Sequence, residues 1–395
     1  MKKSLSRSEY VYIASMLFGM FFGAGNLIFP VYMGQMAGRN MWPALIGFII
    51  TGVGLPLLGV AALGISRSSG LFELSSHIGR PYGYFFTCAL YLTIGPFFAI
   101  PRCATTSFTV GIEQIIPQGS DKLSLYLLLF SLAFFVAALL FSLYPGKIMV
   151  WVGKILNPAF LLFLGILVVV TLVNPGAAIA EVEPAGDYAT VPFFEGFIEG
   201  YNTLDALASL AFGIVVVNVI RGLGVEDGDA VASNTVRAGI FSCLLMAVIY
   251  FFVTLIGVHS RGVMASAENG GVALAQIAKH YLGAPGLIVL AATVTLACLK
   301  TSVGLITSCA ETFAGMFKGL SYRAWAIIFS VVAFGFANFG LSNIISYSLP
   351  VLMFLYPLAI VLIVLSLCGK FFEHDRRVYR WVIGFTSVSY THLRA

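Results

Sequence analysis

Asp205 stands in the middle of a long apolar segment, together with two other polar side chains. The stretch EGYNTLDALASLAFG carries Asn202, Thr203 and Asp205 near the centre of an apolar run over residues 192–221. A carboxylate in the hydrocarbon region of a membrane is costly unless it is paired or hydrated, so its presence indicates a functional site. We therefore interpret Asp205 as a candidate functional residue; the alternative is a protonated carboxyl, or one hydrogen-bonded only for packing.

A second cluster interrupts the first apolar run, over residues 8–38. The stretch GMFFGAGNLIFP places glycines beside Asn26, and glycine permits an unwound backbone with free N–H and C=O groups. A half-helix that begins near Asn26 directs its positive end at the centre of the membrane, whereas carbonyls around Gly19 to Phe22 end the preceding half. This arrangement suits an anion and a cation side by side, such as a carboxylate and Na⁺. Close packing of helices through the glycines is the alternative.

A third cluster, LACLKTSVGLITSCAETF, carries Lys300, Thr301 and Ser302 within one apolar run. Hydroxyl oxygens suit hard cations such as Na⁺, although Ser and Thr in membrane helices also bond to their own i−4 carbonyl. The ammonium of Lys300 at this depth must be paired, deprotonated or in contact with water.

A fourth segment, GPFFAIPRCATTS, contains two prolines that predict a kink, and Arg102 within the helix. Two interpretations of Arg102 remain open. The guanidinium pairs with Glu195 or Glu199 as an outer gate, or it reaches to the outer membrane interface.

The elements that position these residues must be membrane-spanning helices. Of the 395 residues, 59% are hydrophobic and 10% are charged, which excludes a soluble, disordered or nucleic-acid-binding chain. Uninterrupted apolar runs also exclude an outer-membrane barrel. We predict spans near residues 8–38, 41–66, 82–116, 123–143, 148–173, 192–221, 236–258, 284–317, 324–339 and 343–368.

The distribution of charge predicts the orientation of these spans. Most lysines and arginines fall in connections on the side of the N-terminus, which is therefore expected in the cytoplasm, in a multi-pass protein of the cytoplasmic membrane. The polar run 380–395 is expected to be an incomplete eleventh helix with an atypical tail, either truncated or foreign.

The spacing of the first two clusters predicts an inverted repeat. Spans one and six are five crossings apart, and five crossings reverse direction. We expect one all-α transporter domain over 1–395, with repeats at about 8–173 and 192–368 that each begin with a broken helix. No Walker A, H-E-x-x-H or G-x-S-x-G motif occurs, which disfavours an ATP-driven pump and a membrane protease or lipase.

Four motifs in order, FFGAGNLIFP, GPFFAIPR, EGYNTLDALASLAFGIVV and LACLKTSVGLITSCAETF, resemble the bacterial branched-chain amino acid:cation symporter family. Its members carry leucine, isoleucine and valine. The resemblance implies a five-plus-five bundle of the leucine-transporter type within the amino acid–polyamine–organocation superfamily. It implies twelve helices in complete members, membrane lipid as surroundings and no obligate protein partner.

The resemblance also implies roles for individual residues. The amides of Ala24, Gly25 and Asn26 would hold the substrate carboxylate, and the broken sixth helix, with Asn202, Thr203 and Asp205, would meet the amino group. Carbonyls of Gly19 and Phe22 would bind Na⁺ with Cys298, Thr301 and Ser302. Lys300 adjoins these ligands, and its amine could replace Na⁺ or carry a proton, so both Na⁺ and H⁺ remain candidate coupling ions. Lys300 and Arg102 are therefore coupling or gating candidates.

We accordingly expect a secondary transporter, not an enzyme, that imports branched-chain amino acids with Na⁺ by alternating access. One alternative is an H⁺-coupled carrier of another small neutral amino acid. The alternative from another class is a polytopic enzyme acting on lipid. That enzyme would need convergent catalytic groups at headgroup depth, whereas the polar clusters lie at mid-depth.

Overall fold

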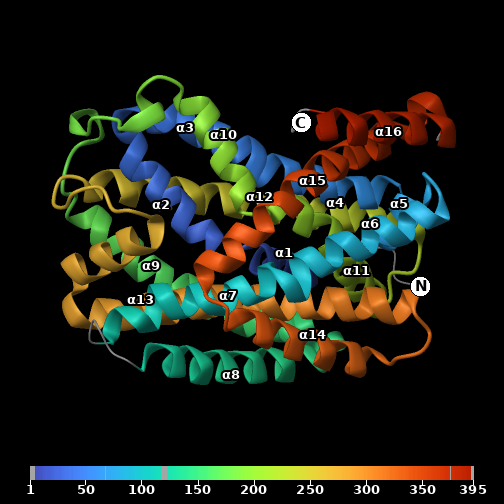
Figure 1. Cartoon of the computed structure of the whole chain (residues 1–395), viewed down its shortest axis with the longest axis horizontal. Coiled ribbons are helices and arrows are strands. Elements are labelled where there is room, and N and C mark those ends of the chain that lie inside the picture. The colour runs from blue at the N-terminus through green and yellow to red at the C-terminus, as the bar shows by residue number, and fades with distance from the viewer. Residues whose placement is uncertain (1–4, 67, 117–121, 374, 393–395) are drawn as a thin grey trace.

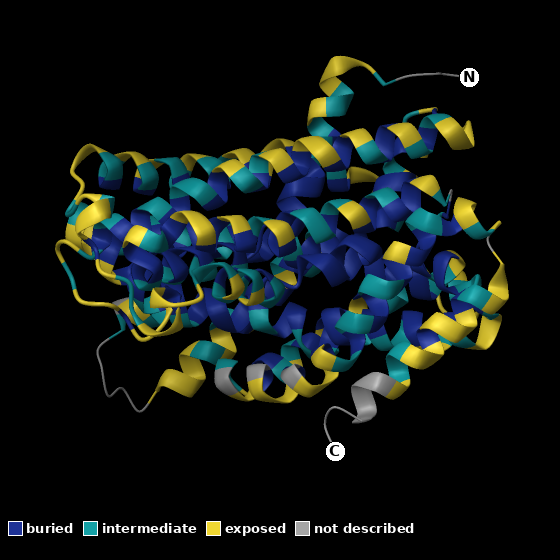
Figure 2. Cartoon of the chain, turned by 90° about the horizontal axis from the view of Figure 1, so that it is seen from above, coloured by how far each residue is buried: buried dark blue, intermediate teal, exposed yellow. Residues whose placement is uncertain are grey.

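Long helices lie side by side along one direction of the molecule (Figure 1). The computed structural model describes residues 5–66, 68–116, 122–373 and 375–392, and none of them forms a strand. Buried residues occupy the space between the helices, and exposed residues lie on the outer faces and at the ends (Figure 2). The all-α, polytopic prediction is confirmed.

The first apolar run is divided into two helices. α1 (Arg7–Phe21) and α2 (Gly25–Ala37) are separated by three residues. The chain then turns back through Gly38–Asn40, where Gly38 has a φ of 50°, a conformation that favours glycine. α3 (Met41–Ile49) and α4 (Leu55–Ile65) follow, joined by one π-helical turn.

The third predicted span is kinked as expected. α6 (Arg80–Leu92) and α7 (Ala99–Ser107) are separated at Gly95, whose φ of −86° and ψ of −119° are not helical. Pro96 follows directly, and its missing N–H accounts for the interruption of the helical hydrogen bonds. α5 (Leu71–Ser76) is a short helix that packs against α6. α8 (Leu123–Ser142) and α9 (Asn157–Val173) complete the first half, and a π-helical segment, Met149–Leu156, leads directly into α9.

The second half also begins with a divided helix. α10 (Pro192–Asn202) is followed by α11 (Asp205–Gly222), α12 (Gly228–Ser260), α13 (Gly270–Met316), α14 (Tyr322–Ala337) and α15 (Leu341–Cys368). Within α13, Gly283 has a φ of 65° and separates an additional helical stretch from the predicted span at 284–317. The inverted symmetry of the two halves stays a prediction, although each half begins with an interruption.

Among the described residues, eight helical runs are long and apolar enough to cross a membrane, and Tyr322–Ala337 is a shorter apolar helix. One run, Gly25–Ile65, joins the second half of the first predicted span to the second predicted span, because the turn at Gly38–Asn40 is itself helical. The predicted eleventh helix is α16 (Arg376–His392); residues 393–395 of the expected tail lie outside the described part.

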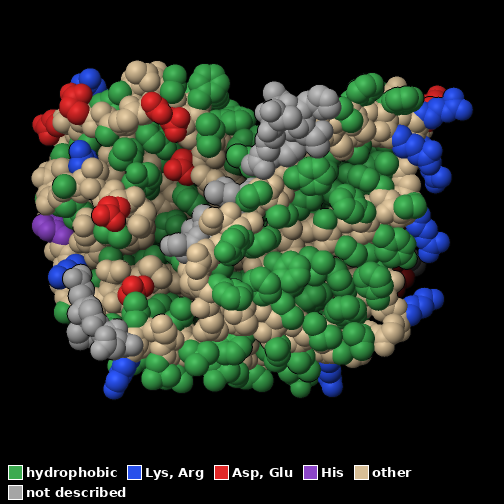
Figure 3. All heavy atoms as spheres, in the orientation of Figure 1, with side chains coloured by type: hydrophobic (Ala, Val, Ile, Leu, Met, Phe, Trp, Pro, Cys, Tyr) green, Lys and Arg blue, Asp and Glu red, His purple; other side chains and the backbone are tan. Residues whose placement is uncertain are grey.

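The surface of the bundle is apolar around its middle (Figure 3). α8 exposes Leu125, Leu129, Leu132 and Leu140. Lysine and arginine gather at the end on the right of the view, whereas acidic side chains are prominent at the other end (Figure 3). An apolar belt between two charged ends is the surface expected of a protein that spans a membrane.

Candidate functional site

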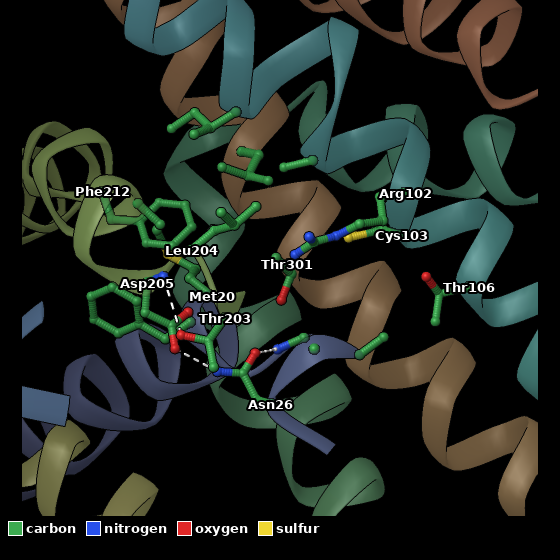
Figure 4. A pocket seen from close by; sticks show the side chains of 18 residues that line it. Met20, Asn26, Arg102, Cys103, Thr106, Thr203, Leu204, Asp205, Phe212 and Thr301 are labelled. Carbon is green, nitrogen blue, oxygen red and sulfur yellow. Dashed lines mark hydrogen bonds between the residues drawn. The ribbon is translucent and has the colours of Figure 1, made fainter. Parts of the chain in front are cut away.

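The two interrupted helices meet at one cavity (Figure 4). Phe22, Gly23 and Ala24 lie outside regular helix between α1 and α2. Between α10 and α11, Leu204 has a φ of 68°, a left-handed conformation that costs a residue with a side chain roughly 1–2 kcal/mol. The predicted breaks are thus present, and both expose backbone groups to the interior.

The cavity has a volume of about 40 Å³ and accommodates a few water molecules. Its lining combines backbone groups and polar side chains with apolar side chains. The polar members are Gly23, Ala24, Gly25, Asn26, Arg102, Cys103, Thr106, Thr203, Asp205 and Thr301, and the apolar members are Met20, Phe21, Ile94, Ala99, Leu204, Ala208, Phe212 and Leu305. The structure therefore brings together most of the predicted substrate residues.

Asn26 connects the two breaks. Its Nδ2 donates to Oδ2 of Asp205 and to the hydroxyl of Tyr250, both at 2.5 Å, and its Oδ1 accepts from the N–H of Gly23 at 2.8 Å. The Tyr250 hydroxyl also donates to Oδ2 of Asp205, at 3.1 Å. The bonds from Asn26 and Tyr250 to Asp205 both fall on Oδ2, and Asp205 itself lines the cavity.

Tyr250 is a member of this site that the sequence analysis missed. It lies on α12, is fully buried and contacts the rings of Phe22 and Phe48. In the sequence, Tyr250 stands among apolar residues and resembles an aromatic residue that serves only for packing. Its partners Asn26 and Asp205 are 224 and 45 residues away in the chain. The only signal is that a fully buried tyrosine hydroxyl requires a hydrogen-bond partner.

The first turn of α2 presents unpaired donors. No side chain caps this helix, and among the described residues the N–H groups of Gly25 and Asn26 have no hydrogen-bond partner. The carbonyl of Ala24 accepts from Leu27 and Ile28, so Ala24 already belongs to the helix start. A helix N-terminus with free N–H groups favours an anion.

The residues predicted to bind a cation lie together beside the first break. A β-carbon built on Gly23 would lie 3.2 Å from Oγ1 of Thr301, so this hydroxyl faces the unwound backbone. Oγ1 of Thr301 and Oγ of Ser302 are buried without a hydrogen-bond partner in the described part of the chain, unlike hydroxyls bonded to an i−4 carbonyl. The carbonyls of Gly19 and Phe22 likewise accept no hydrogen bond from any described residue.

Only Thr301 of these candidate ligands lines the cavity itself. Gly19, Phe22, Cys298 and Ser302 are buried next to it. Unpartnered buried oxygens are uncommon in proteins, because each costs the free energy of lost hydration. Their occurrence on facing segments of α1 and α13 is what a cation site requires.

Arg102 lies between this cavity and a larger one of about 380 Å³. Its Nη2 would be 3.6 Å from a β-carbon built on Gly25. Neither Glu195 nor Glu199 forms an ion pair with it, although all three residues are within the described part; Glu199 instead accepts from Nδ2 of Asn202 at 2.9 Å. The pairing with Glu195 or Glu199 is therefore absent among the described residues, and Arg102 lines both cavities; its reach to the outer membrane interface stays a prediction.

Asn202 lies apart from Thr203 and Asp205. It lines the larger cavity together with Glu199 and Glu268, because α10 ends at Asn202 and the chain then changes direction at Leu204. Thr203 donates to the carbonyl of Gly200 at 2.9 Å, which closes the last turn of α10. The larger cavity therefore carries acidic groups, and Arg102, Thr106 and Gly25 line both cavities.

Lys300 points away from the cavity and is fully buried. Its Nζ donates to Oδ1 of Asn157 at 3.1 Å and lies 3.6 Å from the ring centroid of Phe160. The rings of Phe18 and Phe22 are 4.9 and 5.6 Å away. The partners of this amine in the structure are thus an amide oxygen and the faces of three aromatic rings.

Structures with this arrangement are known for other transporters. The fold is similar to that of MhsT in complex with L-phenylalanine, with a TM-score of 0.59 and 16% identity over 99% of both chains. It is also similar to Mhp1, a nucleobase-cation-symport-1 family transporter, with a TM-score of 0.62 and 17% identity over 90% of this chain and 77% of that one. These similarities establish a fold of the leucine-transporter type.

Comparison with related sequences identifies the family, whereas the similar structures establish only the fold. The chain is 54% identical to the branched-chain amino acid permease BrnQ of Lactobacillus delbrueckii subsp. lactis, over 98% of this chain and 86% of that protein. It is 41% identical to BrnQ of Bacillus subtilis, over 98% and 87% of the two chains, and 38% identical to BrnQ of Escherichia coli, over 96% and 84%. Its relatives are named permeases and carriers, which identifies a transporter and not an enzyme. Residues 6–392 match the family described as branched-chain amino acid transport protein, and the chain belongs to that family.

Proposed function

We propose that this chain is a secondary transporter that imports leucine, isoleucine or valine together with Na⁺. The observation that carries the proposal is the meeting of two broken helices at Asn26 and Asp205, joined by a hydrogen bond of 2.5 Å. One break offers free N–H groups and the other a carboxylate, so a single cavity has complementary partners for both ends of a zwitterion.

The carboxylate of the amino acid binds at the start of α2. The N–H groups of Gly25 and Asn26 are unpaired, and the helix dipole favours negative charge at this point. Arg102 lies on the same side of the cavity and adds positive charge. Both features support an anion at this position.

The ammonium group binds at Asp205. Asn26 and Tyr250 orient this carboxylate by donating to Oδ2. A carboxylate fixed in this way and turned to a small enclosed cavity gives a charge-assisted hydrogen bond, which is stronger than a bond between neutral groups.

The aliphatic side chain of the substrate fits the apolar part of the lining. Ile94, Leu204, Phe212 and Leu305 provide branched and aromatic surface, and the small side chains of Ala99 and Ala208 leave space beside them. The cavity of about 40 Å³ is smaller than an amino acid requires, so binding includes an outward movement of these side chains.

The Na⁺ ion binds between α1 and α13. The buried hydroxyls of Thr301 and Ser302 and the carbonyls of Gly19 and Phe22 lack hydrogen-bond partners in the part of the chain that the structure describes, and the carbonyl of Cys298 completes the proposed set. Hydroxyl and carbonyl oxygens are the ligands that hard cations prefer. A cation here orders the unwound backbone that holds the substrate, so ion and amino acid bind cooperatively.

The distribution of charged residues and the position of the larger cavity indicate the direction of transport. By the positive-inside rule, the end rich in lysine and arginine faces the cytoplasm of a bacterial cell. The larger cavity, with Glu199 and Glu268, then faces outward and adjoins the substrate site through Arg102, Thr106 and Gly25. The opposite side is closed by the packing of α1 against α13 and the Met149–Leu156 segment.

Uptake of labelled leucine into proteoliposomes tests this function. Inward gradients of Na⁺, Li⁺ and choline are compared at equal osmolarity and equal internal pH. We expect accumulation with Na⁺, equilibration alone with choline, and competition by unlabelled isoleucine and valine but not by lysine or glutamate. Accumulation that is equal in all three salts and requires a pH gradient contradicts Na⁺ coupling, and absence of leucine transport contradicts the substrate assignment.

A further inference from the structure

A groove opens on the side of the bundle where α1 begins. Its volume is about 640 Å³, which is within the range of roughly 300–1,000 Å³ that pockets for whole small molecules have. The start of α1 stands out from the bundle near the end marked N (Figure 2). The apolar part of the lining comes from the first turns of the chain, α9 and α12: Leu5, Val11, Ala14, Leu161, Phe241 and Leu245. None of these six residues lines the two cavities of the transport site.

The groove is open to the surroundings of the bundle and not to its interior. The side chains of Val11 and Phe241 are 63% and 58% exposed. Both residues lie near the beginning of predicted spans, at 8–38 and 236–258, so hydrocarbon surrounds them close to the basic end of the protein. An apolar groove at this depth accepts an acyl chain.

The polar groups in the deep part of the groove already have partners. Nδ2 of Asn157 donates to Oγ of Ser15 at 2.9 Å, and this hydroxyl donates to the carbonyl of Gly153 at 2.7 Å. Asn157 and Ser15 both line the groove. Hydrocarbon can lie over them without leaving these donors unpaired, so the usual cost of covering a polar group is avoided.

The mouth of the groove carries a basic side chain on each of its three walls. Arg7 belongs to the lining on α1. Arg237 precedes Phe241 by four residues on α12, and Lys154 precedes Asn157 by three residues on the segment that leads into α9, so each shares a helix face with a lining residue. All three basic side chains are exposed.

These three basic residues lie at the same end of the membrane. α1, α9 and α12 occupy the first, fifth and seventh predicted spans, which cross in the same direction, and each basic residue precedes the apolar lining of its own span. Nζ of Lys154 lies 4.1 Å from the ring centroid of Tyr12 on α1, and Arg237 interacts electrostatically with Tyr10 on the same helix. The walls therefore bring their positive charges toward the start of α1.

The carboxylate of α1 does not enter this groove. Oε2 of Glu9 accepts from the N–H of Ser6 at 2.8 Å and from its hydroxyl at 2.7 Å, as part of the cap of α1. Glu9 is not among the lining residues. The lining with its mouth is thus positive at one end and apolar along its length, which complements an anionic head group followed by an acyl chain.

We propose that this groove binds one anionic phospholipid from the membrane leaflet at the basic end of the protein. An acyl chain lies against Val11, Leu161 and Phe241, and the phosphate lies among the three basic side chains of the mouth. Basic pockets between membrane helices bind anionic head groups in this way, and burial of the chain adds hydrophobic free energy. The lipid holds the inner half of the broken first helix against α9 and α12, and it is separate from the transported amino acid and ion.

Native mass spectrometry of the purified full-length protein, released from a non-ionic detergent, tests this site. Dioleoyl-phosphatidylglycerol and dioleoyl-phosphatidylcholine are titrated separately, without leucine or Na⁺. We expect the first phosphatidylglycerol to bind at least about tenfold more tightly than phosphatidylcholine, because each basic residue near a membrane surface contributes about fivefold in affinity. Glycerol 3-phosphate, which has the phosphate without acyl chains, should not be retained.

Variants of the mouth test the position of the head group. Arg7→Gln combined with Arg237→Gln should weaken the binding of phosphatidylglycerol about 25-fold and leave that of phosphatidylcholine unchanged. The matched control is Lys147→Gln combined with Arg323→Gln, which removes two basic side chains that lie over the ring of Tyr144, outside the groove lining. This control should bind both lipids like the wild type. If the double arginine variant does not fold, Lys154→Gln should give a loss of about fivefold.

A variant of the apolar lining tests the position of the acyl chain. Ala14→Trp fills the groove and should abolish retention of phosphatidylglycerol, whereas Ala133→Trp, on the exposed face of α8, should not change it. Folding of both variants is checked by size-exclusion chromatography.

Three outcomes would overturn the lipid site. Equal affinity for the two lipids shows that the basic mouth does not select a head group. Wild-type retention by the double arginine variant, or equal retention by Ala14→Trp and Ala133→Trp, places the lipid elsewhere on the surface. Because lipid retention is measured without leucine or Na⁺, each of these results leaves the proposed transport function standing, and failure of leucine uptake leaves the lipid site standing.

Discussion

The proposed substrate and ion sites consist of side chains that are buried without complete hydrogen-bond partners. Asp205 accepts from Asn26 and Tyr250 at one carboxylate oxygen and lines the cavity. Thr301 and Ser302 have hydroxyls with no partner among the described residues. Burial of each of these groups without a partner costs the free energy of its lost hydration, which a bound ligand would offset.

Replacing Asp205 with Asn should weaken leucine binding by roughly 10- to 100-fold, because a charge-assisted hydrogen bond becomes a neutral one. Equilibrium binding of labelled leucine at saturating Na⁺ measures this. Glu311→Gln is the matched control, since Glu311 is a carboxylate in the same bundle that accepts from Asn218 and lies outside the cavity lining. Unchanged affinity of Asp205→Asn in folded protein would remove Asp205 from the site.

Replacing Thr301 with Ala should raise the Na⁺ concentration for half-maximal leucine binding about tenfold, because one oxygen ligand is lost. Thr293→Ala is the control on the same helix, since the Thr293 hydroxyl is satisfied by the carbonyl of Val289 at 2.7 Å. The maximum amount of bound leucine should be similar in both variants. Equal Na⁺ dependence of the two variants would contradict the proposed ligand set.

At the level of elements, the second half of the broken first helix, α2, is held by close backbone contacts with α12. A β-carbon on Gly257 of α12 would strike the carbonyl of Val31, and one on Gly34 of α2 would strike the carbonyl of Thr254. The outer half of the broken helix is therefore fixed to α12, which also carries Tyr250. This packing keeps the free N–H groups of α2 aimed at the cavity.

Gly257→Ala should destabilise the protein by about 1–3 kcal/mol, because the added methyl group forces α2 and α12 apart. The melting temperature in detergent, with and without leucine, measures the effect. Gly335→Ala is the control, since no atom lies within 4 Å of a β-carbon at that position. A melting temperature equal to that of the control would show that the α2–α12 contact is not tight.

Gly25→Leu should abolish leucine binding, because the side chain would extend toward Phe29 and Arg102 at the mouth of the cavity, where a β-carbon already lies 3.2 and 3.6 Å from them. Gly165→Leu is the control on α9, where nothing lies within 4 Å of the β-carbon position. Both variants should be folded by size-exclusion chromatography. Normal binding by Gly25→Leu would place the substrate elsewhere.

The breaks in the helices could be predicted from sequence because their cause is local. Gly19, Gly23 and Gly25 lower the helix propensity of one segment, and Asn26 provides the polar group that replaces the lost backbone bonds. The break at Leu204 was located by its polar neighbours, although nothing about a leucine predicts a left-handed backbone. The boundary at Gly283 agrees with the start of the predicted span at 284, whereas the helical stretch that precedes it was not predicted.

Partners that are distant in the chain could not be predicted. Tyr250 meets Asn26 across 224 residues, and Lys300 meets Asn157 across 143. Both contacts depend on how α1, α9, α12 and α13 pack, which a single apolar sequence leaves undetermined. For the same reason the sequence left two interpretations of Arg102 open, and its position between two cavities could not be predicted.

At the scale of the whole molecule, the charged ends indicate which side faces the cytoplasm. Replacing Glu183 with Cys should give labelling by a membrane-impermeant maleimide in intact cells, whereas Lys318→Cys should react only after lysis, because the basic end faces inward. The wild type, with its six native cysteines, gives the background. Labelling of Lys318→Cys in intact cells would reverse the orientation.

The central claim is that two interrupted helices recognise both charged ends of one small zwitterion. Competition against labelled leucine, at saturating Na⁺, tests it with three compounds that share the same branched chain: leucine, isoamylamine and isocaproate. The account predicts that leucine competes and that neither analogue does at comparable concentration, since each leaves Asp205 or the N–H groups of α2 without a partner. Competition by either analogue with the affinity of leucine would contradict the claim.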